Sequence, residues 1–173
     1  MYLSTWKRSR PKPCRKLHRS KAFVVLIRNN SNGNNNIPEV LIVRESYNEL
    51  GFPGGTYDKR DKSHLVCAKR EFAEEIGVEV PPINFLELTK YRYKYITMNI
   101  FATVLSDDIA KTIPTFSRNY GELHGSYWIP ITKLLSTTYI NKFRPIFKYW
   151  MHGLVAVIHL ALLTDHLNKL NDI

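Results

Sequence analysis

One short stretch of the chain, residues 54–78, constrains its fold more than any other. It reads GGTYDKRDKSHLVCAKREFAEEIGV, and it ends in a dense group of acidic side chains within a protein that is otherwise strongly basic. Ser63 is a suitable N-cap and Gly77 a suitable left-handed stop, so we predict a helix from Ser63 to Ile76. So many carboxylates on one short helix require a chemical explanation.

The predicted helix carries two kinds of surface. At about 100° per residue, apolar side chains fall on one face and carboxylates on an adjacent face. The apolar face consists of Leu65, Ala68, Phe72 and Ile76, and the acidic face of Glu71, Glu74 and Glu75. We therefore expect the three carboxylates to converge on one spot. Because carboxylates this close repel one another, either solvent and basic neighbours screen them or a divalent cation neutralises them. Oxygen ligands favour Mg²⁺ or Mn²⁺ over Zn²⁺.

A glycine-rich loop, Gly51-Phe52-Pro53-Gly54-Gly55, precedes this helix. Glycine lacks a Cβ and tolerates positive φ, so such a loop can bring backbone groups close to a ligand. Loop and helix together resemble the Nudix box: a glycine, five residues, an acid, seven residues, then R-E-apolar-x-E-E-x-G-apolar. Gly55 matches the glycine, Asp61 replaces the usual Glu, and Arg70 begins the final segment.

The box departs from the common pattern by one residue. Eight residues rather than seven separate Asp61 from Arg70, which is similar to the box of Nudix coenzyme A diphosphatases. The second signature of those enzymes, an Arg-rich segment upstream of the glycines, is poorly matched by residues 41–46, LIVRES. The resemblance therefore indicates the Nudix family without selecting one of its substrates.

The resemblance implies a fold and a reaction. The fold is α/β, an α/β/α sandwich with a mixed β-sheet. The reaction is attack of water on the bridging diphosphate of a nucleoside diphosphate linked to another group, assisted by Mg²⁺ or Mn²⁺. By the same resemblance Glu71, Glu74 and Glu75 are metal ligands, joined by the Gly55 carbonyl. We expect Arg70 to hold the acidic cluster through Asp61.

Further candidate site residues lie outside the helix. Glu122 precedes an aromatic-apolar-Pro segment, where many Nudix proteins carry an acid that assists metal binding or acts as base, so we predict it as the fourth carboxylate. His124 is a second candidate for this role, because an unperturbed imidazole pKa of about 6.5 suits proton transfer. The candidate substrate-binding residues are Arg44, Gly54, Gly55, Tyr91 and Tyr93. The two tyrosines either stack on bases or cover an edge of the core.

The remaining chain predicts a single domain. We expect a basic arm over residues 1–21 and the hydrolase domain over residues 22–173. The expected strands are Ala22–Arg28 and Val40–Arg44, paired as a hairpin with a long loop, and then Phe85–Tyr95 and Ile96–Leu105. They are followed by a loop over residues 106–119, a loop entering a strand over residues 121–130, a short helix over 131–136 and a long one within 143–170.

Charge and composition indicate the class of ligand and the cellular location of the protein. Lys and Arg total 25 against 15 acids, a net charge of +10 that favours polyanions. Two cysteines are too few for a disulfide framework, so we predict an intracellular, cytoplasmic protein. The longest apolar run, Leu154–Leu163, falls short of the roughly 18 residues of a membrane span.

Three functions remain open at this point. The first is removal of the 5′ cap from RNA, because the positive charge and the supply of Tyr and Trp suit backbone contacts and stacking. The second is a small-molecule diphosphatase for coenzyme A, ADP-ribose, a nucleoside triphosphate or a diphosphoinositol phosphate. The third is a non-catalytic Nudix module that binds RNA, although the complete set of three carboxylates argues against it.

Overall fold

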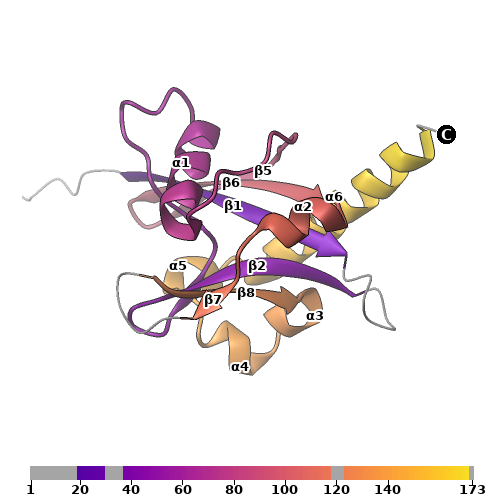
Figure 1. Ribbon diagram of the computed structural model, residues 1–173. Helices are drawn as coiled ribbons and strands as arrows, with labels where there is room; N and C mark the ends of the chain where they lie inside the picture. Colours follow the sequence, from indigo (N-terminus) through magenta and orange to yellow (C-terminus); the bar gives the residue numbers. More distant parts are fainter. Residues whose placement is uncertain (1–18, 30–36, 118–122, 172–173) are drawn as a thin grey trace, which may run out of the picture.

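A mixed β-sheet forms the middle layer of the protein (Figure 1). The computed structural model describes residues 19–29, 37–117 and 123–171. Within them the strands follow the order β5-β6-β1-β2-β8-β7, while β3 pairs with β2 and β4 with β1. Their bounds are β1 Arg19–Asn29, β2 Pro38–Glu45, β3 Leu50–Gly51, β4 Gly54–Thr56, β5 Leu86–Tyr93, β6 Ile96–Leu105, β7 Phe116–Ser117 and β8 Leu123–Pro130. β1 and β6 run parallel, and the other described pairs are antiparallel.

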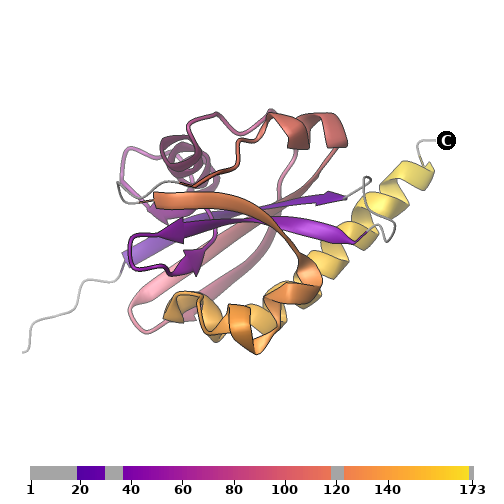
Figure 2. The ribbon, with the colours of Figure 1, turned by 60° about the horizontal axis from the view of Figure 1, so that its bottom comes forward.

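Helices cover both faces of this sheet (Figures 1 and 2). Their bounds are α1 His64–Ile76, α2 Asp107–Thr112, α3 Ile131–Leu134, α4 Thr137–Ile140, α5 Pro145–Lys148 and α6 Met151–Asn171. Side chains of α1 and α2 share one buried cluster, and those of α3, α5 and α6 share another on the opposite face. The predicted α/β/α sandwich with a mixed sheet is confirmed.

Strand β1 is the centre of both clusters. Ala22, Val24 and Leu26 pack toward α1, whereas Phe23, Val25 and Ile27 pack toward α6, and all six are fully buried. A continuous apolar run is typical of a strand covered on both faces. The predicted hairpin is also confirmed, because Ile27 of β1 lies opposite Val40 of β2.

The ends of α1 are those that the sequence predicts. Ser63 caps the helix, and its hydroxyl accepts a hydrogen bond from the Val66 N–H at 3.2 Å. Gly77 ends it in the left-handed region, with φ 84°, and its N–H donates to the Ala73 carbonyl at 2.9 Å. Of the predicted apolar face, Ala68, Phe72 and Ile76 are buried and Leu65 is only partly buried.

Residues 106–117 are more ordered than the loop that we predicted. Ser106 precedes α2, whose first turn contains Asp107 and Asp108, and negative charge there is favourable beside the positive end of the helix dipole. Ala110 of this helix is buried. The following strand β7 pairs with β8, with Phe116 opposite Ser126. The rest of the predicted loop lies outside the described residues.

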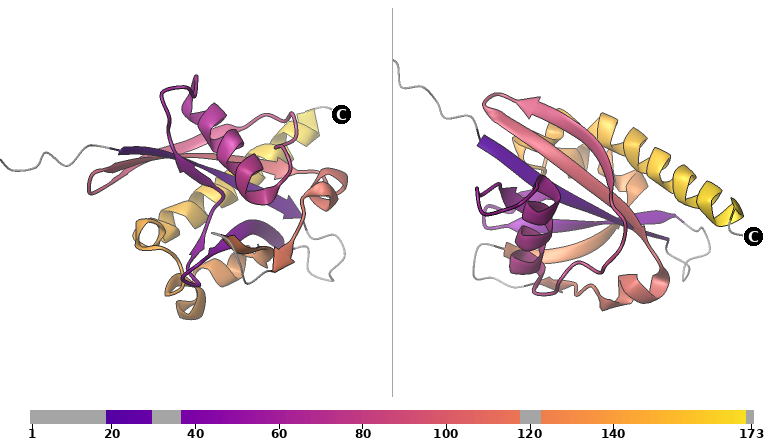
Figure 3. Two further views of the ribbon diagram at one scale, coloured as in Figure 1. Left: turned by 60° about the vertical axis from the view of Figure 1, so that its left-hand side comes forward. Right: turned by 90° about the horizontal axis from the view of Figure 1, so that it is seen from above.

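The predicted C-terminal helix is divided into α5 and α6. Phe147 anchors α5, since its ring packs edge-on against Phe23 and Phe52 with centroids 4.9 and 5.3 Å apart. The first turns of α6 bury Met151 and Leu154. Val155 and Ile158 of the apolar run are buried in the same cluster. The last turns of α6 then extend past the strands (Figure 3).

The predicted basic arm lies almost wholly outside the described residues. Its last three residues, Arg19 to Lys21, are described and belong to β1. They cannot be part of a separate arm, because they pair with β6 along the sheet.

Among the described residues, no helix is both long and apolar enough to cross a lipid bilayer.

Replacing Phe147 by alanine tests the packing of the C-terminal segment. We expect Phe147→Ala to lower the free energy of unfolding by about 3–5 kcal/mol, because it leaves a cavity between Phe23 and Phe52. Tyr149→Ala is the control, since Tyr149 is 74% exposed. Urea denaturation followed by circular dichroism measures both variants. Equal stability of the two would contradict the described packing.

Candidate active site

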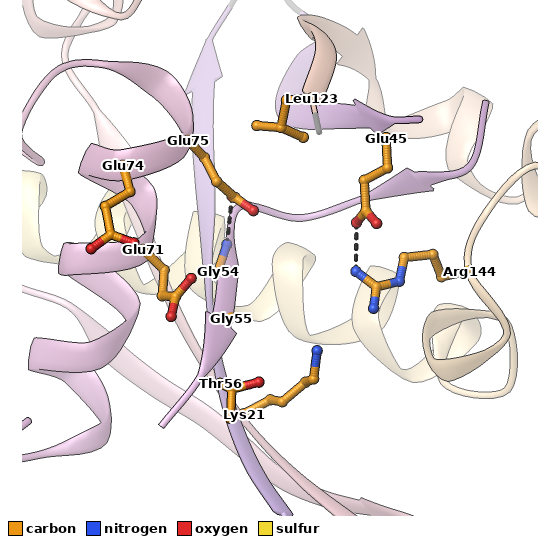
Figure 4. Close-up of a pocket in the computed structure, with 10 residues that line it drawn as sticks. All are labelled: Lys21, Glu45, Gly54, Gly55, Thr56, Glu71, Glu74, Glu75, Leu123 and Arg144. Atoms are coloured by element: carbon orange, nitrogen blue, oxygen red, sulfur yellow. Dashed lines mark hydrogen bonds and ion pairs between the residues drawn. The ribbon is translucent and has the colours of Figure 1, made fainter. Parts of the chain in front are cut away.

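A cavity of about 460 Å³ opens where α1 meets the sheet (Figure 4). It is called the acidic pocket below, and it is lined by Lys21, Glu45, Gly54, Gly55, Thr56, Glu71, Glu74, Glu75, Leu123 and Arg144. Three carboxylates project from α1 on one wall, and two basic side chains lie across from them. Groups from β1, β2, β4, β8 and α1 therefore meet at one place.

The two box glycines allow α1 to lie close to β4. Gly54 has φ 143°, and a Cβ at this position would overlap the backbone of Ala22 and Phe23 in β1. A Cβ on Gly55 would collide with the carboxylate of Glu71. The Gly54 N–H donates to the Glu75 carboxylate at 2.9 Å, which ties the helix to the strand. Both glycines are therefore required by space, and Gly54 also by its backbone angle.

Burial changes the acid strength of Glu75. Its removal from water, outweighing the hydrogen bond from Gly54, raises the pKa of the Glu75 carboxyl to about 8. Glu45 and Glu71 act in the same direction. In the absence of a cation, Glu75 therefore binds a proton at neutral pH.

Arg70 organises the other two carboxylates. Its Nε and Nη2 atoms donate to the two oxygens of Asp61 at 3.0 Å each, as predicted for this pair. It also forms ion pairs with Glu71 at 3.0 Å and Glu74 at 3.2 Å. Asp61 is only 5% exposed, and the hydrogen bonds from Arg70 hold the pKa of its carboxyl well below the usual range. The extra box residue thus leaves Asp61 within reach of Arg70.

The three carboxylates share a wall but do not converge on one point. Among residues 19–29, 37–117 and 123–171, no three acidic, histidine or cysteine side chains are arranged to hold one metal ion. The expected convergence on one point is therefore wrong for the described positions of these side chains. The reason is that Arg70 holds Glu71 and Glu74, while Glu75 is held by Gly54.

The donor chemistry of this wall nevertheless fits a hard divalent cation. Glu71, Glu74 and Glu75 offer carboxylate oxygens, and β4 passes beside them. Oxygen ligands of this kind suit Mg²⁺ or Mn²⁺. Glu71 and Glu75 are held by single contacts that a cation can replace.

A basic wall that we did not predict faces the carboxylates. Lys21 reaches the acidic pocket from β1, and Arg144 reaches it from the residue before α5. Arg144 donates from Nη1 to Glu45 of β2, and its backbone N–H donates to the Leu50 carbonyl at 3.0 Å. Burial, followed by the charge of Arg144, lowers the pKa of Lys21. No sequence spacing relates residues 21 and 144 to the box, so only the fold reveals this wall.

The other predicted site residues lie elsewhere. Tyr91 stacks on Trp150 and Tyr93 on Tyr149, with centroids 6.4 and 5.5 Å apart, so both cover an edge of the core and neither lines the acidic pocket. Arg44 lines a different cavity. Glu122 lies outside the described residues. His124 is in β8, and its carbonyl accepts a hydrogen bond from Arg44 at 3.1 Å.

Comparison with known proteins defines the class. The model of the NUDIX domain matches residues 18–150. The chain therefore belongs to the Nudix family, and it is a Nudix hydrolase. Enzymes of this family generally depend on a divalent metal.

Solved structures share the fold at low sequence identity. A mutT/nudix family protein from Listeria innocua is 14% identical with a TM-score of 0.64, over 87% of this chain and 99% of that protein. The NUDIX domain of Shewanella oneidensis NrtR, complexed with ADP ribose, is 17% identical with a TM-score of 0.58, over 85% and 90%. An Ap4A hydrolase from C. elegans is 15% identical with a TM-score of 0.57, over 82% and 98%.

A curated relative matches a shorter segment. A protein of Acanthamoeba polyphaga mimivirus, provisionally named as an mRNA-decapping protein, is 40% identical over 62 residues. This segment is 32% of the present chain and spans only 17% of the length of that relative.

The raised pKa of Glu75 predicts how stability depends on pH without metal. The folded protein binds a proton at Glu75 up to a pH of about 8, whereas the usual pKa is 4.5. The contribution of Glu75 to the free energy of unfolding is therefore complete below pH 4.5. It decreases by roughly 2–5 kcal/mol as the pH rises from there to about 8. Urea denaturation in EDTA from pH 4.5 to 8.5 measures the slope. Glu75→Gln should remove most of it, and an unchanged slope in that variant would contradict the assignment.

Replacing Gly55 by alanine tests the close approach of β4 and α1. The new methyl group must displace the Glu71 carboxylate, which ends a flexible side chain. We therefore expect Gly55→Ala to weaken Mn²⁺ binding at least about tenfold, with a stability change of only about 1 kcal/mol. Gly153→Ala is the control, because Gly153 is an exposed glycine of α6 that does not line the acidic pocket. Isothermal titration of Mn²⁺ gives the affinities, and equal Mn²⁺ affinity in both variants would refute the proposed role of Gly55.

Proposed function

We propose that this chain is a metal-dependent pyrophosphohydrolase that removes the 5′ cap from RNA. The observation that supports the chemistry best is the acidic pocket, in which Glu45, Glu71, Glu74 and Glu75 share one cavity with Lys21 and Arg144. Carboxylates repel a diphosphate unless cations intervene, whereas the two basic side chains attract it. A pocket with both walls suits a diphosphate that lies between bound metal and fixed positive charge.

In this proposal Glu71, Glu74 and Glu75, with the Gly55 carbonyl, hold Mg²⁺ or Mn²⁺. A bound divalent cation supplies charge neutralisation of the phosphate oxygens and a lower pKa for water. Glu75 gives up its proton when the site is loaded, because a nearby positive charge favours the carboxylate. One of these carboxylates, or Glu122, orients and deprotonates the attacking water.

The basic wall binds the diphosphate. Lys21 and Arg144 lie across the cavity from α1, where they can contact phosphate oxygens that the carboxylates do not reach. Glu45 holds Arg144 in place through its ion pair. Arg70 acts on the other wall, where its contacts with Asp61 and Glu71 position the acidic side chains. It is therefore a positioning residue in this proposal.

Two observations support capped RNA as the substrate. The first is the similarity of a segment of the chain to the mimivirus protein named for mRNA decapping. The second is the net charge of +10, which favours a polyanion over a small metabolite. The basic residues 1–18, outside the described residues, contribute to this charge.

The first experiment compares substrates at matched concentration. We expect Mn²⁺- or Mg²⁺-dependent release of a methylated guanosine diphosphate from cap-labelled RNA, with slower cleavage of free cap analogue, coenzyme A and ADP-ribose. EDTA should abolish turnover, and so should combined Glu74→Gln and Glu75→Gln. Faster cleavage of coenzyme A or ADP-ribose than of capped RNA would make the chain a small-molecule diphosphatase. Specific binding of capped RNA without any cleavage would make it an RNA-binding module.

The same assay tests the basic wall. A charge-assisted hydrogen bond contributes about 1.5–3 kcal/mol, so we expect Arg144→Ala to lower kcat/KM by about 10- to 100-fold. Arg92→Ala is the matched control, because Arg92 is an exposed arginine of β5 that does not line the acidic pocket. An equal effect of the two substitutions would show a loss of general charge, not of a specific contact.

A further inference from the structure

A second cavity, of about 480 Å³, borders the end of β2. It is called the tyrosine cavity below. The residues that carry the argument are Ile42, Arg44, Leu50, Tyr127, Tyr139 and Lys142. Among the described residues that line it there is no carboxylate, in contrast to the acidic pocket. We propose that this cavity binds a nucleotide unit of the substrate, with its base against the tyrosines and its phosphate beside Arg44 and Lys142.

Arg44 is held in place but retains binding capacity. Its Nη2 atom donates to the Ser117 hydroxyl and to the His124 carbonyl, each at 3.1 Å. Its Nε atom is buried and has no hydrogen-bond partner. Within the described part of the chain no carboxylate forms an ion pair with it. A buried donor without an acceptor is unfavourable, so a ligand oxygen gains more at this guanidinium than on an open surface, provided that the side chain turns Nε toward the cavity.

The aromatic walls suit a planar group. The guanidinium carbon of Arg44 lies 5.6 Å from the ring centre of Tyr127, and the Lys142 ammonium lies 5.9 Å from that of Tyr139. Ile42 and Leu50 add buried apolar surface. Bases stack on aromatic rings irrespective of their sequence, and two positive charges without a carboxylate select an anion. A base that carries a phosphate satisfies both conditions.

The tyrosine cavity borders the same two segments as the acidic pocket. Arg44 lines the tyrosine cavity, and the next residue, Glu45, lines the acidic pocket. In the same way, Lys142 lines the tyrosine cavity and Arg144 lines the acidic pocket. Both residues form backbone hydrogen bonds with Leu50, of 2.8 and 3.0 Å. Because the two cavities border these shared segments, we place in the tyrosine cavity the nucleotide that is attached to a diphosphate in the acidic pocket. That this nucleotide is part of the cleaved substrate rests on the proposed function, whereas binding of a nucleotide by the tyrosine cavity does not.

The test is binding of adenosine 5′-monophosphate to the full chain, measured by isothermal titration in EDTA. Adenosine and ribose 5-phosphate are titrated beside it, because they carry the base and the phosphate separately. We expect AMP to bind more tightly than either. Lys142→Ala and Tyr139→Leu should each weaken AMP binding about tenfold, the effect of losing one stacking or charge contact. Tyr139→Phe, which keeps the ring, should bind AMP as the unaltered chain does.

Matched controls separate this site from other parts of the surface. Lys133→Ala removes an equal charge from an exposed position of α3, and Tyr149→Leu removes a tyrosine that is 74% exposed. Neither residue lines the tyrosine cavity, so both variants should keep the AMP affinity. Arg144→Ala should also keep it, because Arg144 lines only the acidic pocket of the two.

Several outcomes would overturn the inference. They are absence of AMP binding, equal binding of ribose 5-phosphate and AMP, and a loss in Arg144→Ala as large as that in Lys142→Ala. The second would indicate a site for phosphate alone, and the third would place AMP in the acidic pocket. Because the titration needs no metal and no turnover, a chain that binds AMP but does not cleave capped RNA refutes only the proposed function.

Discussion

The close approach of α1 to β4 is the contact on which the candidate active site depends. Two glycines in β4 leave no side chain between helix and sheet, and the Gly54 N–H reaches the Glu75 carboxylate directly. Because β4 also pairs with β1 at the centre of the sheet, the position of the helix is fixed relative to both buried clusters. The carboxylates therefore project from a rigid framework, which an ordered metal site requires.

Electrostatic repulsion is the cost of this arrangement, and the protein balances it in three ways. Arg70 holds Glu71 and Glu74 by ion pairs. Arg144 pairs with Glu45 at the opposite side of the pocket. Glu75 takes up a proton, because burial raises its pKa to about 8. In the proposed metal site, a divalent cation would take over the neutralisation of Glu71, Glu74 and Glu75.

Local sequence signals predicted local structure well. Capping residues indicated both ends of α1, and the apolar run over residues 22–28 indicated a strand. The Asp61 to Arg70 contact followed from the box, although an extra residue separates them. The loop assigned to residues 106–119 was too long, because α2 and β7 are short elements stabilised mainly by contacts with distant strands.

Contacts between distant parts of the chain were not accessible to the same reasoning. Lys21 and Arg144 are 123 residues apart, and only the pairing of β1 with β4 and of Leu50 with residues 142 and 144 brings them to one pocket. The alternation of Tyr91 and Tyr93 was visible in the sequence, but not that Trp150 and Tyr149 cover them. Position along a strand indicates a face, whereas the tertiary fold decides what that face contacts.

Arg44 lines one cavity and Glu45 the other, so both cavities are sensitive to insertions and deletions in β2. Successive side chains of a strand point to opposite faces, so a shift of one residue exchanges the faces of all that follow. In β2 a register shift interrupts this alternation between Arg44 and Glu45, so the register at this point decides which cavity each side chain reaches. An insertion or deletion between Val40 and Glu45 would therefore move Arg44 out of the tyrosine cavity and Glu45 out of the acidic pocket together.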